Sequence, residues 1–159
     1  MTELRPLAPA DRDLVRRFLA LRWGSATVML DGRAIDAAAL PGYIGLDGNG
    51  VAALATLLDE AGHSEIVTLD AVRPQSGLGT ALVELAAQRA RALGLGRLLA
   101  RTTNDNLDAL RFYQRRGFRL HRLAPGAIDR EREADPAIPL LGRHGIPLRD
   151  EISLIRPLG

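Results

Sequence analysis

A short loop between an apolar segment and a helical segment carries the clearest chemistry in the sequence. Residues 65–72 are rich in β-branched and large apolar side chains, as a buried strand is. From Leu78 onward the apolar residues follow helical spacing. The amides of residues 75–80 would then lie at a helix N-terminus, where N–H groups lack intrahelical acceptors and favour an anion, most often a phosphate. Gly77 and Gly79 permit close approach of such a ligand, although Gly-x-Gly alone is also compatible with a tight turn that binds nothing.

What the chain lacks narrows the type of site. All 21 basic residues are arginine, so the lysine of a P-loop is missing, and Leu82 stands where a dinucleotide fingerprint needs its third glycine. The absence of cysteine excludes a disulfide framework, a thiolate nucleophile and a cysteine-based zinc site. His121 and His144 do not have the spacing of metal ligands. We therefore expect no metal.

A second motif follows the apolar segment at residues 98–102. Its spacing is Asn106-x-x-Ala109-x-x-x-Tyr113-x-x-x-Gly117-Phe118. This pattern resembles the second acetyl-CoA motif of the GCN5-related N-acetyltransferases (GNAT), and the glycine loop is similar to the pyrophosphate loop of that family, usually written Gln/Arg-x-x-Gly-x-Gly/Ala. The two motifs cover residues 65–118 in the family's order, and the chain ends resemble an uncharacterised bacterial subgroup.

The loop departs from the family pattern in one respect. Pro74 occupies the first position of the motif, with Arg73 before it and Gln75 after it, and the loop is about two residues shorter than usual. The backbone cradle should survive this change, whereas a side-chain contact from that first position is in doubt.

The resemblance implies acetyl-CoA as a co-substrate and assigns roles to particular residues. A backbone N–H near Ala71 or Val72 would stabilise the tetrahedral oxyanion. Tyr113 would hydrogen-bond to or protonate the departing sulfur; its alternative is a tyrosine packed on the inner face of its helix. The residues expected to bind acetyl-CoA are Leu69, Ala71, Val72, Gln75, Ser76, Gly77, Leu78, Gly79, Thr80, Asn104, Asn106, Ala109, Phe112, Tyr113 and Arg116.

The general base depends on the register of one strand. Glu65 has about the spacing of the glutamate that some family members use, directly or through water. Aligning Ala71 with the family's usual apolar residue supports Glu65, whereas aligning Val72 turns Glu65 to the wrong face and favours Asp70.

The acceptor side is weakly marked. Arg22 and Trp23 lie at the end of the first helix and could wall a substrate pocket, although the single tryptophan could instead close the core. His144 lies in an irregular loop and could line the same side or be structural. The arginines between residues 111 and 122 form either a solvated face or a site for the 3′-phosphate of coenzyme A.

The elements that position these residues predict one α+β domain over residues 1–159. An Asn-Gly turn joins two of its strands, and the helix after residue 78 is long enough to return the chain parallel. Strands are expected at 2–8, 42–47, 51–58, 65–72, 98–102, 118–123 and 151–155, with 27–30 a short strand or a loop. Helices are expected at 11–23, 78–93, 106–117 and 127–133. These elements give a mixed, mostly antiparallel sheet of six or seven strands with helices on both faces (an α/β three-layer arrangement). The resemblance adds a bulge near residues 70–72, where acetyl-CoA would pair with strand backbone.

Composition and resemblance together predict a bacterial cytoplasmic acetyltransferase. The chain has no apolar signal segment or membrane-spanning run, and its net charge of +2 gives little reason to expect a nucleic-acid partner. The leading function is acetyl transfer from acetyl-CoA to a small primary amine. The alternatives are a protein or aminoacyl-tRNA acetyltransferase and a non-catalytic acyl-CoA-binding or RNA-binding module. The acceptor, the length of the acyl group and the oligomeric state, including a homodimer, stay open.

Overall fold

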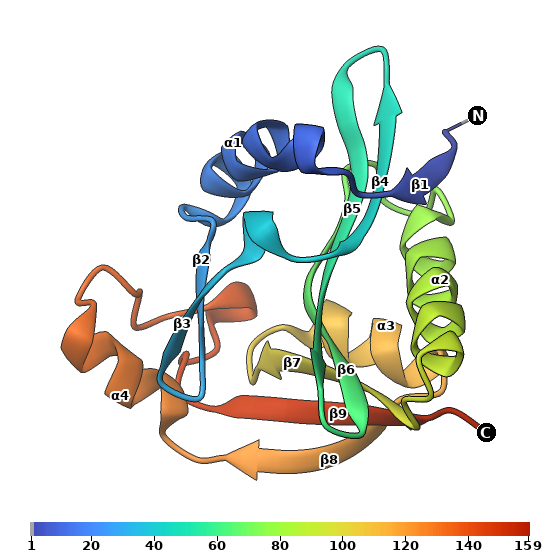
Figure 1. Cartoon of the computed structure of the whole chain (residues 1–159). Helices are drawn as coiled ribbons and strands as arrows, with labels where there is room; N and C mark the ends of the chain where they lie inside the picture. Colours follow the sequence, from blue (N-terminus) through green and yellow to red (C-terminus); the bar gives the residue numbers. More distant parts are fainter. Residues whose placement is uncertain (1) are drawn as a thin grey trace. The chain divides into compact units, whose positions relative to one another are not determined.

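The computed structural model describes residues 2–159, which form two compact units that divide after Gly96 (Figure 1). The first unit contains β1 (Leu4–Pro6), α1 (Arg12–Trp23), β2 (Thr27–Leu30), β3 (Arg33–Asp36), β4 (Gly42–Asp47), β5 (Gly50–Glu60), β6 (His63–Ala71) and α2 (Leu78–Ala92). The second contains β7 (Arg97–Thr103), α3 (Leu107–Arg115), β8 (Arg119–Ala124), α4 (Ala127–Ala134) and β9 (Glu151–Pro157). Seven of these strands belong to a mixed sheet, which confirms the predicted fold class. The single-domain expectation stays a prediction.

In the first unit, the strands pair antiparallel in the order β1-β4-β5-β6. The predicted hairpin joins β4 to β5 through Gly48 and Asn49, and Gly50, which has a positive φ of 108°, pairs with Asp47 as the first residue of β5. Gly42 lies so close to β5 that a Cβ would meet the carbonyl oxygen of Ala55 at 1.8 Å. Glycine is therefore required where β4 begins.

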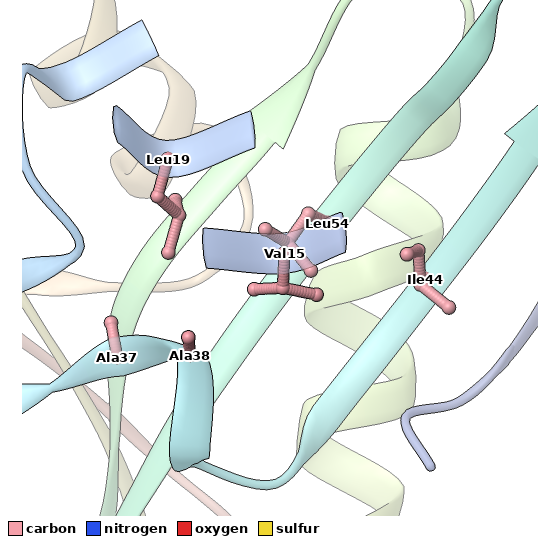
Figure 2. Close-up of a cluster of buried hydrophobic side chains, with 6 residues drawn as sticks. All are labelled: Val15, Leu19, Ala37, Ala38, Ile44 and Leu54. Atoms are coloured by element: carbon pink, nitrogen blue, oxygen red, sulfur yellow. The ribbon is translucent and has the colours of Figure 1, made fainter. Parts of the chain in front are cut away.

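Two apolar layers cover the two faces of this part of the sheet. α1 packs on one face, where Val15 and Leu19 meet Ile44 and Leu54 (Figure 2). α2 packs on the other face, where Leu82 meets alanines of β5. Burial of each large side chain is worth about 1.5–3 kcal/mol. Because side chains alternate along a strand, Leu54 of β5 faces α1 while its neighbours Ala53 and Ala55 face α2.

β2 and β3 form a separate two-stranded antiparallel sheet. From the sequence, residues 27–30 are expected to be either a short strand or a loop, and β3 is not predicted. Three of the four β3 residues are exposed, so the segment has no apolar alternation that would predict a strand.

In the second unit, the strands pair antiparallel in the order β7-β9-β8. The side chain of Asn106 caps α3 by accepting the N–H of Ala109 at 3.1 Å, and Gly117 follows the helix with a φ of 88°. The stretch between α4 and β9 is irregular but well held. Arg132 of α4 donates to the carbonyl oxygens of Ile138, Pro139 and Leu148 at 2.6–3.1 Å.

Candidate active site

The predicted phosphate loop is a strand–turn–helix element of the first unit. β6 ends at Ala71 and α2 begins at Leu78. Gln75 and Gly77 between them have positive φ values of 60° and 81°, which re-aim the backbone just before the helix. The first turn of α2 carries no acidic residue, so nothing in that turn competes with an anion for its N–H groups. The loop therefore has the geometry of an anion site.

β6 contains a bulge that decides the direction of Glu65. Thr68 pairs with Thr56 of β5, but Ile66 pairs with Leu57, so Val67 is the extra residue. The side chains of Thr68 and Thr56 are hydrogen-bonded at 2.7 Å, which fixes the register there. The ladder between β6 and β5 is regular from Thr68 to Ala71, so this bulge is not the one expected at residues 70–72, which stays a prediction.

The bulge brings two carboxylates to one face. Asp70 pairs with Leu54, which packs in the α1 core, and Glu65 pairs with Leu58. Leu54 and Leu58 are an even number of residues apart on a regular strand and share a face, so their partners share it too. In a regular strand, two residues five apart such as Glu65 and Asp70 would point to opposite faces. Glu65 is 2% exposed, buried in the same stripe as Thr68 and Asp70.

Asp70 is occupied by the end of α1. Its Oδ1 accepts the Nε–H of Arg22 and its Oδ2 accepts the indole N–H of Trp23, both at 3.0 Å. Both oxygens thus bind α1, which favours an anchoring role for Asp70 over that of the general base. Trp23 does not close the core, because 56% of its surface is exposed.

The two candidate oxyanion donors differ in direction. The N–H of Val72 donates to the carbonyl oxygen of Ala52 in β5 at 2.9 Å. Successive N–H groups of a strand point to opposite edges, so the N–H of Ala71 points away from β5. The Val72 amide is therefore excluded from this role, and Ala71 is the candidate.

Tyr113 lies on the buried side of α3 in the second unit. It is 8% exposed, and its ring makes edge contacts with Phe112 and Phe118 at centroid distances of 5.2 and 5.0 Å. These contacts fix the ring and its direction. They agree with the packed alternative for the ring, and they leave the role of the hydroxyl as a prediction.

The arginines near the end of α3 are not equivalent. The guanidinium carbon of Arg116 lies 3.8 Å from the ring centre of Phe112, and its Nη1 donates to the carbonyl oxygen of Phe112. Burial, and secondarily the charge of Arg115, lower the pKa of Arg116 below its usual value. Arg111 is exposed and paired with Asp108 at 2.9 Å. Arg115 is exposed, which makes it the better-placed residue of the three for a phosphate.

Asn104 and Asp105 hold the loop that carries His144. The side-chain oxygen of Asn104 accepts the N–H groups of Arg149 and Asp150 at 3.0 Å, and its nitrogen donates to Pro147 at 2.9 Å. Asp105 accepts the N–H of Arg143 at 2.8 Å.

These contacts change two assignments. The amide of Asn104 is engaged by the chain's own backbone, so we assign Asn104 to the loop and not to acetyl-CoA. Asp105 is a residue that was not among the predicted site residues. The loop that contacts Asp105 has glycine at position 142, because a Cβ there would lie 2.2 Å from the Asp105 carboxylate. Within that loop His144 has a φ of 60°, which is rare for a residue with a side chain.

The predicted site residues are thus divided between the units. The loop, Ala71, Glu65, Arg22 and Trp23 belong to the first, whereas the α3 residues and His144 belong to the second. Across residues 2–159, no group of three His, Cys, Asp or Glu residues could hold a metal ion. No helix in the described part of the chain is long and apolar enough to cross a membrane.

Comparisons with known proteins point to one family. Residues 42–118 match the family model described as "Acetyltransferase (GNAT) family". The uncharacterised protein YxbD of Bacillus subtilis (strain 168) is 39% identical over 154 residues, which cover 96% of this chain and 97% of YxbD.

Solved structures show the same fold at lower identity. An acetyltransferase of Bacillus subtilis in complex with CoA has a TM-score of 0.73 at 19% identity, covering 100% of both chains. A GNAT family acetyltransferase of Elizabethkingia anophelis with acetyl-CoA bound has a TM-score of 0.69 at 18% identity, covering 99% of this chain and 98% of that chain. The family model, the relative along almost the whole chain and the shared fold lead to one conclusion: the chain belongs to the GNAT acetyltransferase family.

Proposed function

We propose that this protein transfers the acetyl group of acetyl-CoA to the primary amine of a small molecule. The observation that carries the proposal is the β6–loop–α2 element. Its loop leads from β6 to the N-terminal amides of α2, and the last N–H of β6, that of Ala71, points away from β5. Two proteins of the same fold have CoA or acetyl-CoA bound, which supports this choice of acetyl donor. The proposal includes a cytoplasmic location, where acetyl-CoA is supplied.

The acetyl donor would be held mainly by backbone. Amides of residues 75–80 would bind the pyrophosphate, and the outward edge of β6 at Leu69 and Ala71 would pair with the pantetheine as an added strand does. In the second unit, Asn106, Ala109 and Tyr113 would complete the donor site by the family pattern.

The transfer needs three proton and charge movements. The amine nitrogen attacks the thioester carbon while a base takes its proton, and the N–H of Ala71 stabilises the oxyanion that forms. The carbon–sulfur bond then breaks, and the hydroxyl of Tyr113 gives its proton to the departing thiolate. The products are the acetylated amine and coenzyme A with a free thiol.

Glu65 is our choice for the base. The Val67 bulge puts Glu65 on the α1 face of β6, whereas both oxygens of its rival Asp70 are engaged by Arg22 and Trp23. A carboxylate on this face would take the ammonium proton directly or through one water.

Release of free thiol from acetyl-CoA tests the proposal. The purified protein is incubated with acetyl-CoA and a panel of amines, amino acids and peptides, and thiol is measured over time. Turnover with small amines supports the proposal. Turnover with peptides alone would favour a protein acetyltransferase, and binding of acetyl-CoA without turnover would favour the non-catalytic alternative.

A further inference from the structure

We infer that Arg22 and Trp23 form a binding site for a carboxylate carried by the acceptor amine. The acceptor class is then amino acids and similar molecules that hold an amine and a carboxylate together. This inference rests on the acetyl transfer proposed above and names the substrate class for it.

Arg22 is oriented by a carboxylate on its buried side. Its Nε donates to Oδ1 of Asp70 at 3.0 Å, and the Asp70 side chain is 5% exposed while that of Arg22 is 42% exposed. Among residues 2–159, the hydrogen bonds and ion pairs of Arg22 use Nε and leave both terminal nitrogens for another partner. The guanidinium carbon of Arg22 lies over the ring of Phe18, 5.9 Å from the ring centre. A guanidinium held in this way presents two parallel N–H groups, which match the two oxygens of a carboxylate.

Trp23 is fixed by the same carboxylate. Its indole N–H donates to Oδ2 of Asp70 at 3.0 Å, while 56% of the residue is exposed. The polar edge of the indole is thus satisfied inside, and the apolar ring is offered outside. A substrate whose carboxylate binds Arg22 would place its carbon chain against this ring.

The same anchor links this pair to the proposed reaction centre. Asp70 precedes Ala71, the proposed oxyanion donor, and shares its face of β6 with Glu65. An acceptor with its carboxylate on Arg22 would therefore lie near the proposed oxyanion donor, at the end of β6 that carries Asp70.

Other arginines of α1 differ from Arg22. Arg16 is paired with Asp13 and Asp36 at the surface. Arg17 is exposed on the same helix and contacts no carboxylate among residues 2–159, which makes it the matched control. The buried carboxylate behind Arg22 reduces the entropy lost when a ligand is bound, because the guanidinium is already oriented.

Acceptor pairs provide the first test. Each amino acid of the panel is compared with the amine that lacks its carboxylate, in wild type, Arg22→Ala, Arg22→Lys and Arg17→Ala. Loss of a bidentate charged pair should raise KM for the amino acid roughly ten- to hundredfold in Arg22→Ala and leave kcat and the matching amine nearly unchanged. Arg22→Lys should recover little, since lysine lacks the fork, and Arg17→Ala should behave as wild type.

The single tryptophan gives a second test that needs no turnover. Because the chain has one tryptophan, its fluorescence reports directly on this site. Amino acids should change the emission of Trp23 saturably, the matching amines should not, and Arg22→Ala should abolish the change. A wild type that treats each amino acid and its amine alike in both assays overturns the inference. Amino-acid binding seen by fluorescence with no thiol release from any acceptor would instead overturn the proposed acetyl transfer and keep the site.

Discussion

At the scale of single residues, Glu65 and Asp70 have the same chemistry and different surroundings. Asp70 is bound on both oxygens by donors from α1, one of them charged. Glu65 is buried farther along the same face, next to the bulge. We therefore expect loss of Glu65 to affect the chemical step and loss of Asp70 to affect the position of α1.

The Glu65→Gln variant tests this division. It keeps the shape of the side chain and removes the base, so kcat at neutral pH should fall roughly 10²–10⁴-fold with acetyl-CoA affinity retained. Asp70→Asn should mainly raise the KM of the acceptor, because its amide cannot accept both N–H groups. A loss of kcat in Asp70→Asn together with a fully active Glu65→Gln would exchange the two roles.

Tyr113→Phe tests the proposed acid. The substitution removes one oxygen and keeps the edge contacts with Phe112 and Phe118, so thermal stability should change little. The lost interaction exists mainly in the transition state, so kcat and kcat/KM should fall together, on the order of ten- to a thousandfold. Tyr43→Phe, at the other tyrosine of the chain, is the control. Normal turnover by Tyr113→Phe would make Tyr113 a packing residue only.

At the scale of elements, α2 has a glycine with positive φ at each end. Gly77 precedes the helix with a φ of 81°, and Gly94 follows it with a φ of 73°. A Cβ at either position would meet nothing within 4 Å, so both substitutions to alanine act through backbone strain alone.

Comparing alanine variants at the two ends of α2 separates an effect on stability from an effect on acetyl-CoA binding. Gly77→Ala and Gly94→Ala should each cost about 1–2 kcal/mol of unfolding free energy. Only Gly77→Ala should also weaken acetyl-CoA binding, because only that end carries the proposed pyrophosphate loop. Calorimetric titration checks this, and equal acetyl-CoA affinity in the two folded variants would remove the phosphate assignment from the loop.

At the scale of the whole molecule, stability should depend on one ion pair at the start of the chain. Arg5 of β1 donates to both oxygens of Asp11, which also accepts the N–H of Ala8. The hydrogen bonds from Arg5, then that from Ala8, lower the pKa of Asp11 from 3.8 to about 2.

The sign of the pH effect follows from that shift. Because the folded pKa lies below the unfolded one, the stabilisation is present above about pH 4 and is lost as pH falls towards 2. The pair is exposed on the Arg5 side, so solvent screens it and its contribution to stability is modest. Asp11→Asn should lower the melting temperature at pH 7 and flatten its fall between pH 4 and 2. An unchanged profile would show that other carboxylates control acid unfolding.

Much of this architecture could be predicted because the signals are local. Helix periods, the Asn-Gly turn and the glycines after α1, α2 and α3 specify elements within a few residues. Contacts between distant residues left no such signal. Nothing in the sequence pairs Asp70 with Trp23, or Asp105 with the backbone of Arg143, since each bond depends on how separate segments come together. The register of β6 was ambiguous for the same reason, because an extra residue in a strand looks like any other.

The bulge at Val67 shifts the alternation of side chains along β6 by one residue. Residues on its two sides alternate normally, yet odd numbers before the bulge share a side with even numbers after it. Deleting Val67 would restore a regular ladder, with Ile66 still opposite Leu57 and Glu65 still opposite Leu58, so both carboxylates would keep their face. A homologue without the bulge would therefore carry the same two carboxylates four residues apart, where this chain has them five apart.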